Sequence, residues 1–65
     1  MKIKLDLRAA QIRIQQNQKV YAQMNDPDKL PKIVTHASLD SIVDANGESI
    51  DICHVDYLYS NDLHI

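Results

Sequence analysis

Three histidines and one cysteine are the side chains best suited to chemistry, and all four lie in the C-terminal half of the chain. Cys53 and His54 are adjacent, with His36 before them and His64 after them. Thiolate and imidazole groups bind zinc, and a Cys–His pair can also supply a nucleophile and its base. If Cys53 and His54 lie in a strand, however, they point to opposite faces, so only one can join a given site. We therefore expect no metal site and no cofactor.

An enzymatic function is not indicated by the remaining residues. Gly47 is the only glycine, which leaves little loop material for a phosphate-binding loop or an oxyanion hole. The carboxylate pairs Asp40/Asp44 and Asp51/Asp56 fit an exposed acidic face and need no catalytic role. Histidines among these carboxylates would be favoured in the protonated form near neutral pH, which allows a pH switch, although surface histidines among acids are common. We expect a protein that is not an enzyme.

The charges of the chain are divided between its two halves. All seven Lys and Arg residues lie in residues 1–32, a basic segment with a net charge of +4. Residues 33–65 contain none and form an acidic segment with a net charge of −6, so the whole chain has a charge of −2. Two surfaces of opposite sign favour an oriented encounter with a charged partner or with a second copy of the chain.

The tyrosines near the C-terminus are candidates for a protein interface. Tyrosine is enriched among the residues that anchor interfaces, and neighbouring aspartates would orient a basic partner. An alternative is that these tyrosines only cap a small core. We expect a small non-catalytic binding or regulatory protein that acts through a protein–protein interface, such as an accessory protein or an inhibitor from a mobile element. The candidate partner-binding residues are Asp56, Tyr57, Leu58 and Tyr59.

Nucleic-acid binding is the alternative function. Arginine, lysine and glutamine side chains reach phosphates and base edges, and several occur in the basic segment. The presence of only two arginines and a sequence pI near 5.8 favour an ordinary solvated helix face. A dimeric nucleic-acid-binding regulator would use the segment from Arg8 to Lys19. Its candidate binding residues are Arg8, Gln11, Arg13, Gln15 and Lys19.

The length and composition predict one small domain over residues 1–65. A chain of this size buries only about 60% of its unfolded surface, and this one has no Phe or Trp to fill its core. Self-association as a homodimer would stabilise such a core. A single cysteine excludes an intrachain disulfide and favours a cytoplasmic location. No apolar run is long enough for a transmembrane helix or a signal peptide, so no membrane association is expected.

The N-terminal part is predicted to form a strand and then a helix. Apolar and charged residues alternate over residues 1–7, and residues 8–25 lack Gly and Pro and contain many good helix formers. One continuous helix over residues 2–25, with a heptad seam, is an alternative. Paired strands over residues 11–14 and 19–24 are a third, although the segment between them lacks turn chemistry.

The C-terminal part is predicted to form two or three antiparallel strands after a linker over residues 25–32. Residues 33–36 are β-branched enough for a strand. The Asn46-Gly47 pair favours a two-residue type I′ hairpin that places Val43 opposite Ile50, although it could also close a short helix capped by Ser38. Alternation over residues 53–59 extends the second strand, and residues 60–65 are expected to fray. The predicted fold is a small α+β domain.

Overall fold

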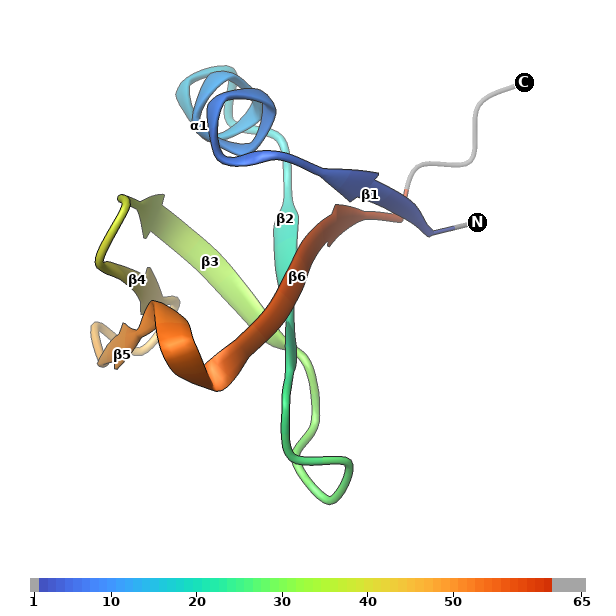
Figure 1. Cartoon of the computed structure of the whole chain (residues 1–65). Helices are drawn as coiled ribbons and strands as arrows, with labels where there is room; N and C mark the ends of the chain where they lie inside the picture. The colour runs from blue at the N-terminus through green and yellow to red at the C-terminus, as the bar shows by residue number, and fades with distance from the viewer. Residues whose placement is uncertain (1, 62–65) are drawn as a thin grey trace.

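A computed structural model of the chain describes residues 2–61, which form one α-helix, one 3₁₀ helix and a six-stranded antiparallel sheet (Figure 1). The prediction of a small α+β domain is confirmed, but the expected sheet of two or three strands is wrong. The strands follow the order β1-β6-β2-β3-β4-β5 across the sheet. The elements are β1 (Ile3–Leu5), α1 (Leu7–Gln15), β2 (Val20–Met24), β3 (Lys32–Ala37), β4 (Ser41–Asp44), β5 (Ser49–Asp51), the 3₁₀ helix η1 (Ile52–His54) and β6 (Val55–Ser60).

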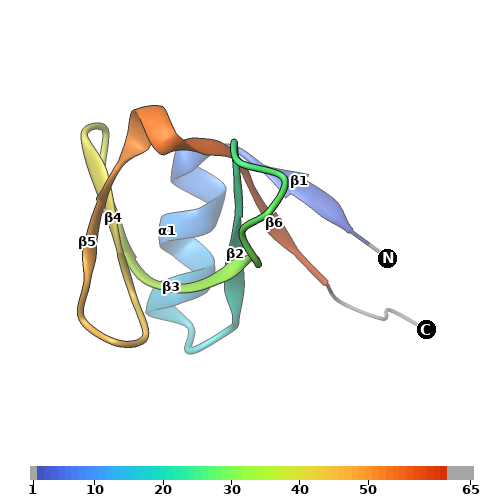
Figure 2. The ribbon, with the colours of Figure 1, turned by 90° about the horizontal axis from the view of Figure 1, so that it is seen from below.

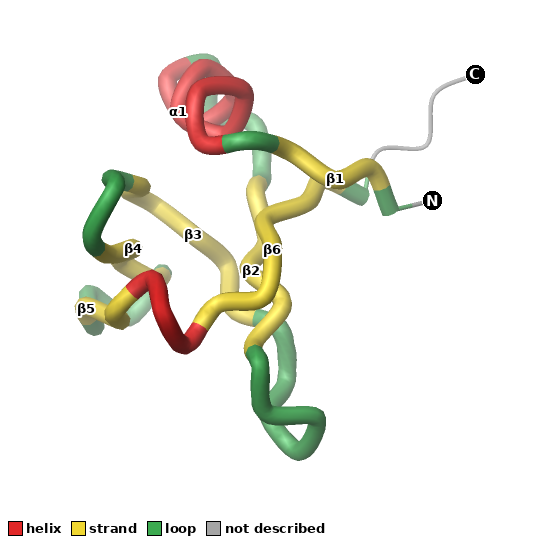
Figure 3. The backbone as a smooth tube through the Cα atoms, viewed as in Figure 1, coloured by secondary structure: helices red, strands yellow, loops and turns green. Residues whose placement is uncertain are grey.

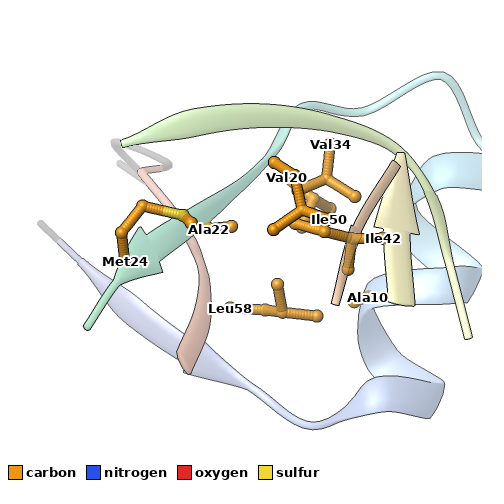
Figure 4. Close-up of a cluster of buried hydrophobic side chains, with 8 residues drawn as sticks. All are labelled: Ala10, Val20, Ala22, Met24, Val34, Ile42, Ile50 and Leu58. Atoms are coloured by element: carbon orange, nitrogen blue, oxygen red, sulfur yellow. The ribbon is translucent and has the colours of Figure 1, made fainter. Parts of the chain in front are cut away.

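The sheet curls around a single core, and α1 lies across one side of it (Figures 1 and 2). The helix contacts β1, β2, β3 and β6, and it contacts β3 more extensively than any of the other three. It approaches closely because its fully buried residue is the small Ala10. The buried apolar side chains gather between the helix and the inner face of the sheet (Figure 4). They are Ala10, Val20, Ala22, Met24, Val34, Ile42, Ile50 and Leu58.

The helix is shorter than predicted, because the chain reverses at Asn17. This residue has a φ of 60°, in the left-handed region that asparagine tolerates better than most residues. Its N–H donates to Ile14 O at 3.0 Å and the N–H of Gln18 donates to Arg13 O at 2.9 Å, the hydrogen-bond pair of a Schellman motif. At the other end, the Asp6 carboxylate accepts a hydrogen bond of 2.7 Å from Ala9 N. The predicted helix over residues 8–25 is confirmed for residues 8–15 and is wrong beyond them, and the continuous helix over residues 2–25 is wrong.

Residues 20–24 form the strand β2 instead, between β6 and β3. Val20, Ala22 and Met24 are buried, whereas Tyr21 and Gln23 point to the other face and are half-buried. The period of two in this segment therefore reflects a sheet. The alternative with paired strands over residues 11–14 and 19–24 is correct for its second strand, which forms as β2 over residues 20–24. It is wrong for residues 11–14, which are helical.

The turn between β4 and β5 contains Asn46-Gly47, but the predicted two-residue type I′ hairpin does not form. That turn needs a positive φ at both central residues, and only Gly47 has one, at 82°. Gly47 N donates to Asp44 O at 3.0 Å, and Asp44 N donates to Glu48 O at 3.0 Å. The loop therefore has three residues, with glycine at its left-handed position.

The longer loop shifts the pairing of β4 with β5 by one residue. Val43 lies opposite Ser49, and Ile42 lies opposite Ile50. Both isoleucines are buried in the core, whereas Val43 is only half-buried. A shift of one residue exchanges the two faces of a strand, so the inward-facing residue of β4 is Ile42 where the prediction had Val43.

The second half of the predicted hairpin is interrupted by η1, and β6 starts only at Val55. Pairing between β6 and β2 shifts near Asp56, which lies between the paired Val55 and Tyr57. The expected frayed tail is wrong for Ser60, which is fully buried at the end of β6. Residues 62–65, including Asp62 and His64, lie outside the described residues.

The predicted linker over residues 25–32 forms the loop between β2 and β3, except that Lys32 already belongs to β3 (Figure 3). No helix within residues 2–61 is long and apolar enough to cross a membrane.

Candidate functional site

Three tyrosines from two neighbouring strands form a cluster on the outer face of the sheet. Tyr59 of β6 pairs with Lys4 of β1 on one side and with Tyr21 of β2 on the other. The rings of Tyr21 and Tyr59 stack with their centroids 5.4 Å apart, and Tyr57 lies against Tyr59 at 5.8 Å. Alternation in β6 directs Tyr57 and Tyr59 outward because Leu58 between them packs in the core.

Two lysines from the N-terminus cover these rings. Lys2 Nζ lies 5.0 Å from the ring centroid of Tyr59, and Lys4 Nζ lies 4.7 Å from that of Tyr57. An ammonium group over an aromatic face is attracted by the ring quadrupole. We call Lys2, Lys4, Tyr21, Tyr57 and Tyr59 the tyrosine face. Because neighbouring side chains surround it, Tyr59 is only 5% exposed and acts as the centre of this face.

The charge beside the tyrosines is opposite to the one suggested by the sequence. From the sequence, we expect negatively charged aspartates to lie beside Tyr57 and Tyr59. In the structure, the charged groups in contact with the rings are Lys2 and Lys4, which are brought in by the pairing of β1 with β6. Asp56 is exposed but occupies the irregular position between two paired residues of β6.

The four predicted partner-binding residues differ in how far their side chains reach the surface. Leu58 is 5% exposed and belongs to the core, so its side chain is not part of the surface. Tyr59 supports its neighbours, while Tyr57 is half-buried and Asp56 is exposed. Sequence reasoning missed Tyr21 because it had been assigned to a helix. The period of two at Val20, Ala22 and Met24 was the available signal for a strand.

The predicted nucleic-acid-binding residues are only partly brought together. Arg8, Gln11 and Gln15 are exposed and share one side of α1, since they are spaced by three and four residues. The Gln11 side chain is engaged, because its Nε2 donates to Ala37 O at 2.9 Å. Arg13 is half-buried, and Lys19 lies beyond the helix in the connection to β2.

Three potential metal donors meet at η1. The donor atoms of Asp51, Cys53 and His54 all lie within 4.8 Å of one another, and all three residues are exposed. The expectation that Cys53 and His54 point to opposite faces is wrong, because both belong to a 3₁₀ turn rather than a strand. His36 is exposed on β3, and His64 lies outside the described residues.

Comparisons of this chain with protein-family models, with curated proteins and with solved structures found no match.

Proposed function

We propose that this chain is a small non-catalytic binding or regulatory protein that acts through a protein–protein interface centred on the tyrosine face. The observation that carries the proposal is the contact of three tyrosine rings and two lysine ammonium groups on one side of the sheet. Tyrosine gives a large contact area at a low cost in side-chain entropy and is enriched among residues that dominate binding energy. The proposal includes a cytoplasmic location, which the single cysteine favours.

The chemistry of this face favours an acidic partner. Its charged members, Lys2 and Lys4, are both cationic and already lie over the rings that a partner would contact. A carboxylate from the partner can pair with either ammonium group while an apolar side chain packs beside Tyr57. In addition, β1 is the terminal strand of the sheet, so an extended acidic segment could pair with its edge.

A charge reversal on the tyrosine face tests this proposal. Partners are captured from extracts of the native cell with the wild-type chain and with the Lys4→Glu and Tyr57→Ala variants, and a captured partner is then purified and its binding is measured directly. We expect each variant to weaken binding at least about tenfold, the size of effect seen at interface anchors. Lys29→Glu is the matched control, because Lys29 is also exposed but lies in the β2–β3 loop. Equal binding by the Lys4→Glu, Tyr57→Ala and control variants would refute the proposal.

The second candidate is a dimeric nucleic-acid-binding regulator that uses the Arg8–Lys19 segment. Its specific support is the shared helix side of Arg8, Gln11 and Gln15. Binding to random duplex DNA should then weaken steeply as salt is raised, because released counterions drive such binding. An Arg8→Ala/Lys19→Ala variant should lower both the affinity and the salt dependence. Absence of DNA binding at low salt would exclude this candidate.

A further inference from the structure

We propose that Asp51, Cys53 and His54 form a binding site for a divalent transition metal of the zinc class, with water in the fourth position. The three residues supply one carboxylate oxygen, one sulfur and one imidazole nitrogen, and these donor atoms lie within 4.8 Å of one another. A mixture of sulfur and nitrogen donors selects zinc and similar ions over magnesium or calcium, which prefer oxygen alone.

The spacing of the donors is close to that of a bound tetrahedral ion. Metal–ligand bonds of about 2.0 to 2.3 Å place neighbouring ligands of a tetrahedral zinc roughly 3.4 to 3.6 Å apart. The observed limit of 4.8 Å therefore requires a closure of roughly 1 Å. Because all three side chains are exposed, rotation about their own bonds can supply this closure without moving the backbone.

The backbone that carries the donors is held from three directions. Ile52 packs its side chain against the core, and its N–H donates to Asp40 O at 2.9 Å. Asn25 fixes the other end of η1: its Nδ2 donates to Cys53 O at 2.6 Å and its N–H donates to His54 O at 3.0 Å. The turn is thus anchored through its backbone and through Ile52, while the side chains of its neighbours project outward. A site on such a preorganised turn loses little entropy when the ion binds.

The surroundings leave access for the ion and its water. Asp51 and His54 line an open hollow between β5 and the β2–β3 loop, together with Glu48 and Lys29. The carboxylates of Asp51 and Glu48 are balanced in this hollow by the ammonium groups of Lys29 and Lys32, so the donor set and not the net charge selects the ion. Three protein donors with an accessible fourth position are the arrangement of a metal site that exchanges a ligand, whereas structural zinc sites use four protein donors.

Cobalt provides the primary test, since it occupies zinc sites and reports a bound thiolate by charge-transfer absorption. Titration of the reduced protein with Co²⁺ should give this absorption, and Zn²⁺ should displace it with one ion bound per chain. We expect a dissociation constant for Zn²⁺ of about 10 μM or tighter at neutral pH. Zn²⁺ should also protect Cys53 from alkylation. A titration with no thiolate band, or with one ion shared by two chains, would overturn the proposed open three-donor site.

Variants separate this site from general surface binding. Cys53→Ser should abolish the cobalt band, and His54→Ala and Asp51→Asn should each weaken Zn²⁺ binding at least about tenfold. His36→Ala is the matched control, because His36 is an exposed histidine outside the cluster. Circular dichroism of every apo variant should match the wild type, since these side chains are exposed. If His36→Ala weakens binding as much as His54→Ala does, the assignment to η1 is refuted.

Discussion

Asp44 is an acidic residue with only 2% of its surface exposed, and its position explains the shape of the β4–β5 turn. Its Oδ1 accepts hydrogen bonds of 2.9 Å from both Asn46 N and Glu48 N. Its own backbone closes the loop through Gly47 N and Glu48 O. The carboxylate therefore satisfies backbone donors that the three-residue loop would otherwise leave without a partner.

Removing this carboxylate should destabilise the protein. Asp44→Ala leaves two loop N–H groups without their acceptor, so we expect the free energy of unfolding to fall by about 1 to 3 kcal/mol. Urea denaturation followed by circular dichroism measures the change. Glu48→Ala is the control, because the exposed Glu48 contributes only its backbone to these hydrogen bonds, and it should stay within about 0.5 kcal/mol of the wild type. An equal loss in both variants would contradict the assigned role of the Asp44 side chain.

At the scale of elements, Asn17 decides where the helix gives way to the sheet. With a φ of 60°, it makes the reversal that lets residues 20–24 enter the sheet as β2. A residue with a Cβ but without a polar side chain pays roughly 1 kcal/mol or more in this conformation. Asn17 therefore stabilises the end of α1 through its backbone conformation.

Substitutions at Asn17 should follow backbone strain and not helix propensity. Asn17→Ala should lower the free energy of unfolding by about 1 kcal/mol, although alanine is the better helix former. Asn17→Gly should be neutral or slightly stabilising, because glycine adopts positive φ without strain. Thermal and urea unfolding of the two variants give the comparison. A more stable alanine variant would show that the left-handed conformation is not needed.

Much of the element pattern could be predicted locally, and the rest depended on distant contacts. Alternation over residues 1–7 correctly indicated β1, although Leu7 already belongs to α1. Asn17 could not be identified as a helix end, because it lies in a Gln- and Asn-rich run that is compatible with a helix. The predicted pairing of β4 with β5 differs from the observed pairing by one residue. An Asn-Gly pair fits loops of two or three residues, and the side chain of Asp44 stabilises the longer loop.

The candidate sites show the same limit. The tyrosine face depends on the pairing of β6 with both β1 and β2, and no local pattern predicts that Lys4 will meet Tyr57. The orientation of Cys53 and His54 depends on Asn25, which lies across a sequence separation of 28 residues from Cys53. The residue types alone identified tyrosines, cysteine and histidine as candidate site residues. The residues that surround them in the structure could not be predicted, because they are brought together by pairing between distant segments.

For the whole molecule, the division of charge along the sequence becomes in part a division in space. Lys2, Lys4, Arg8 and Arg13 belong to the region of β1 and α1, whereas Asp40, Glu48 and Asp51 lie around β4, β5 and η1 (Figure 1). Lys29 and Lys32 are the exceptions, because they line the same hollow as Glu48 and Asp51. The molecule measures 32 × 24 × 20 Å, and exposed charges are screened over about 8 Å at physiological salt, so each region acts mainly on a partner in contact with it. Two copies can therefore attract each other with opposite ends in contact.

Self-association of the protein should accordingly depend on salt. Sedimentation velocity at low ionic strength should show concentration-dependent association, and this should weaken as salt is raised toward and beyond about 0.15 M. A Lys2→Glu/Arg8→Glu variant should lose the association, because both changes fall in the basic region. A dimer that persists unchanged at high salt would instead indicate an interface held by apolar contacts.

The position of β6 between β1 and β2 also constrains the order of folding. Within residues 2–61, the last strand is β6, which supplies Leu58 to the core and pairs with both β1 and β2. Until residues 55–60 have emerged during synthesis, β1 has no neighbour and one side of β2 is unpaired. The six-stranded sheet can therefore be completed only after translation has passed this strand.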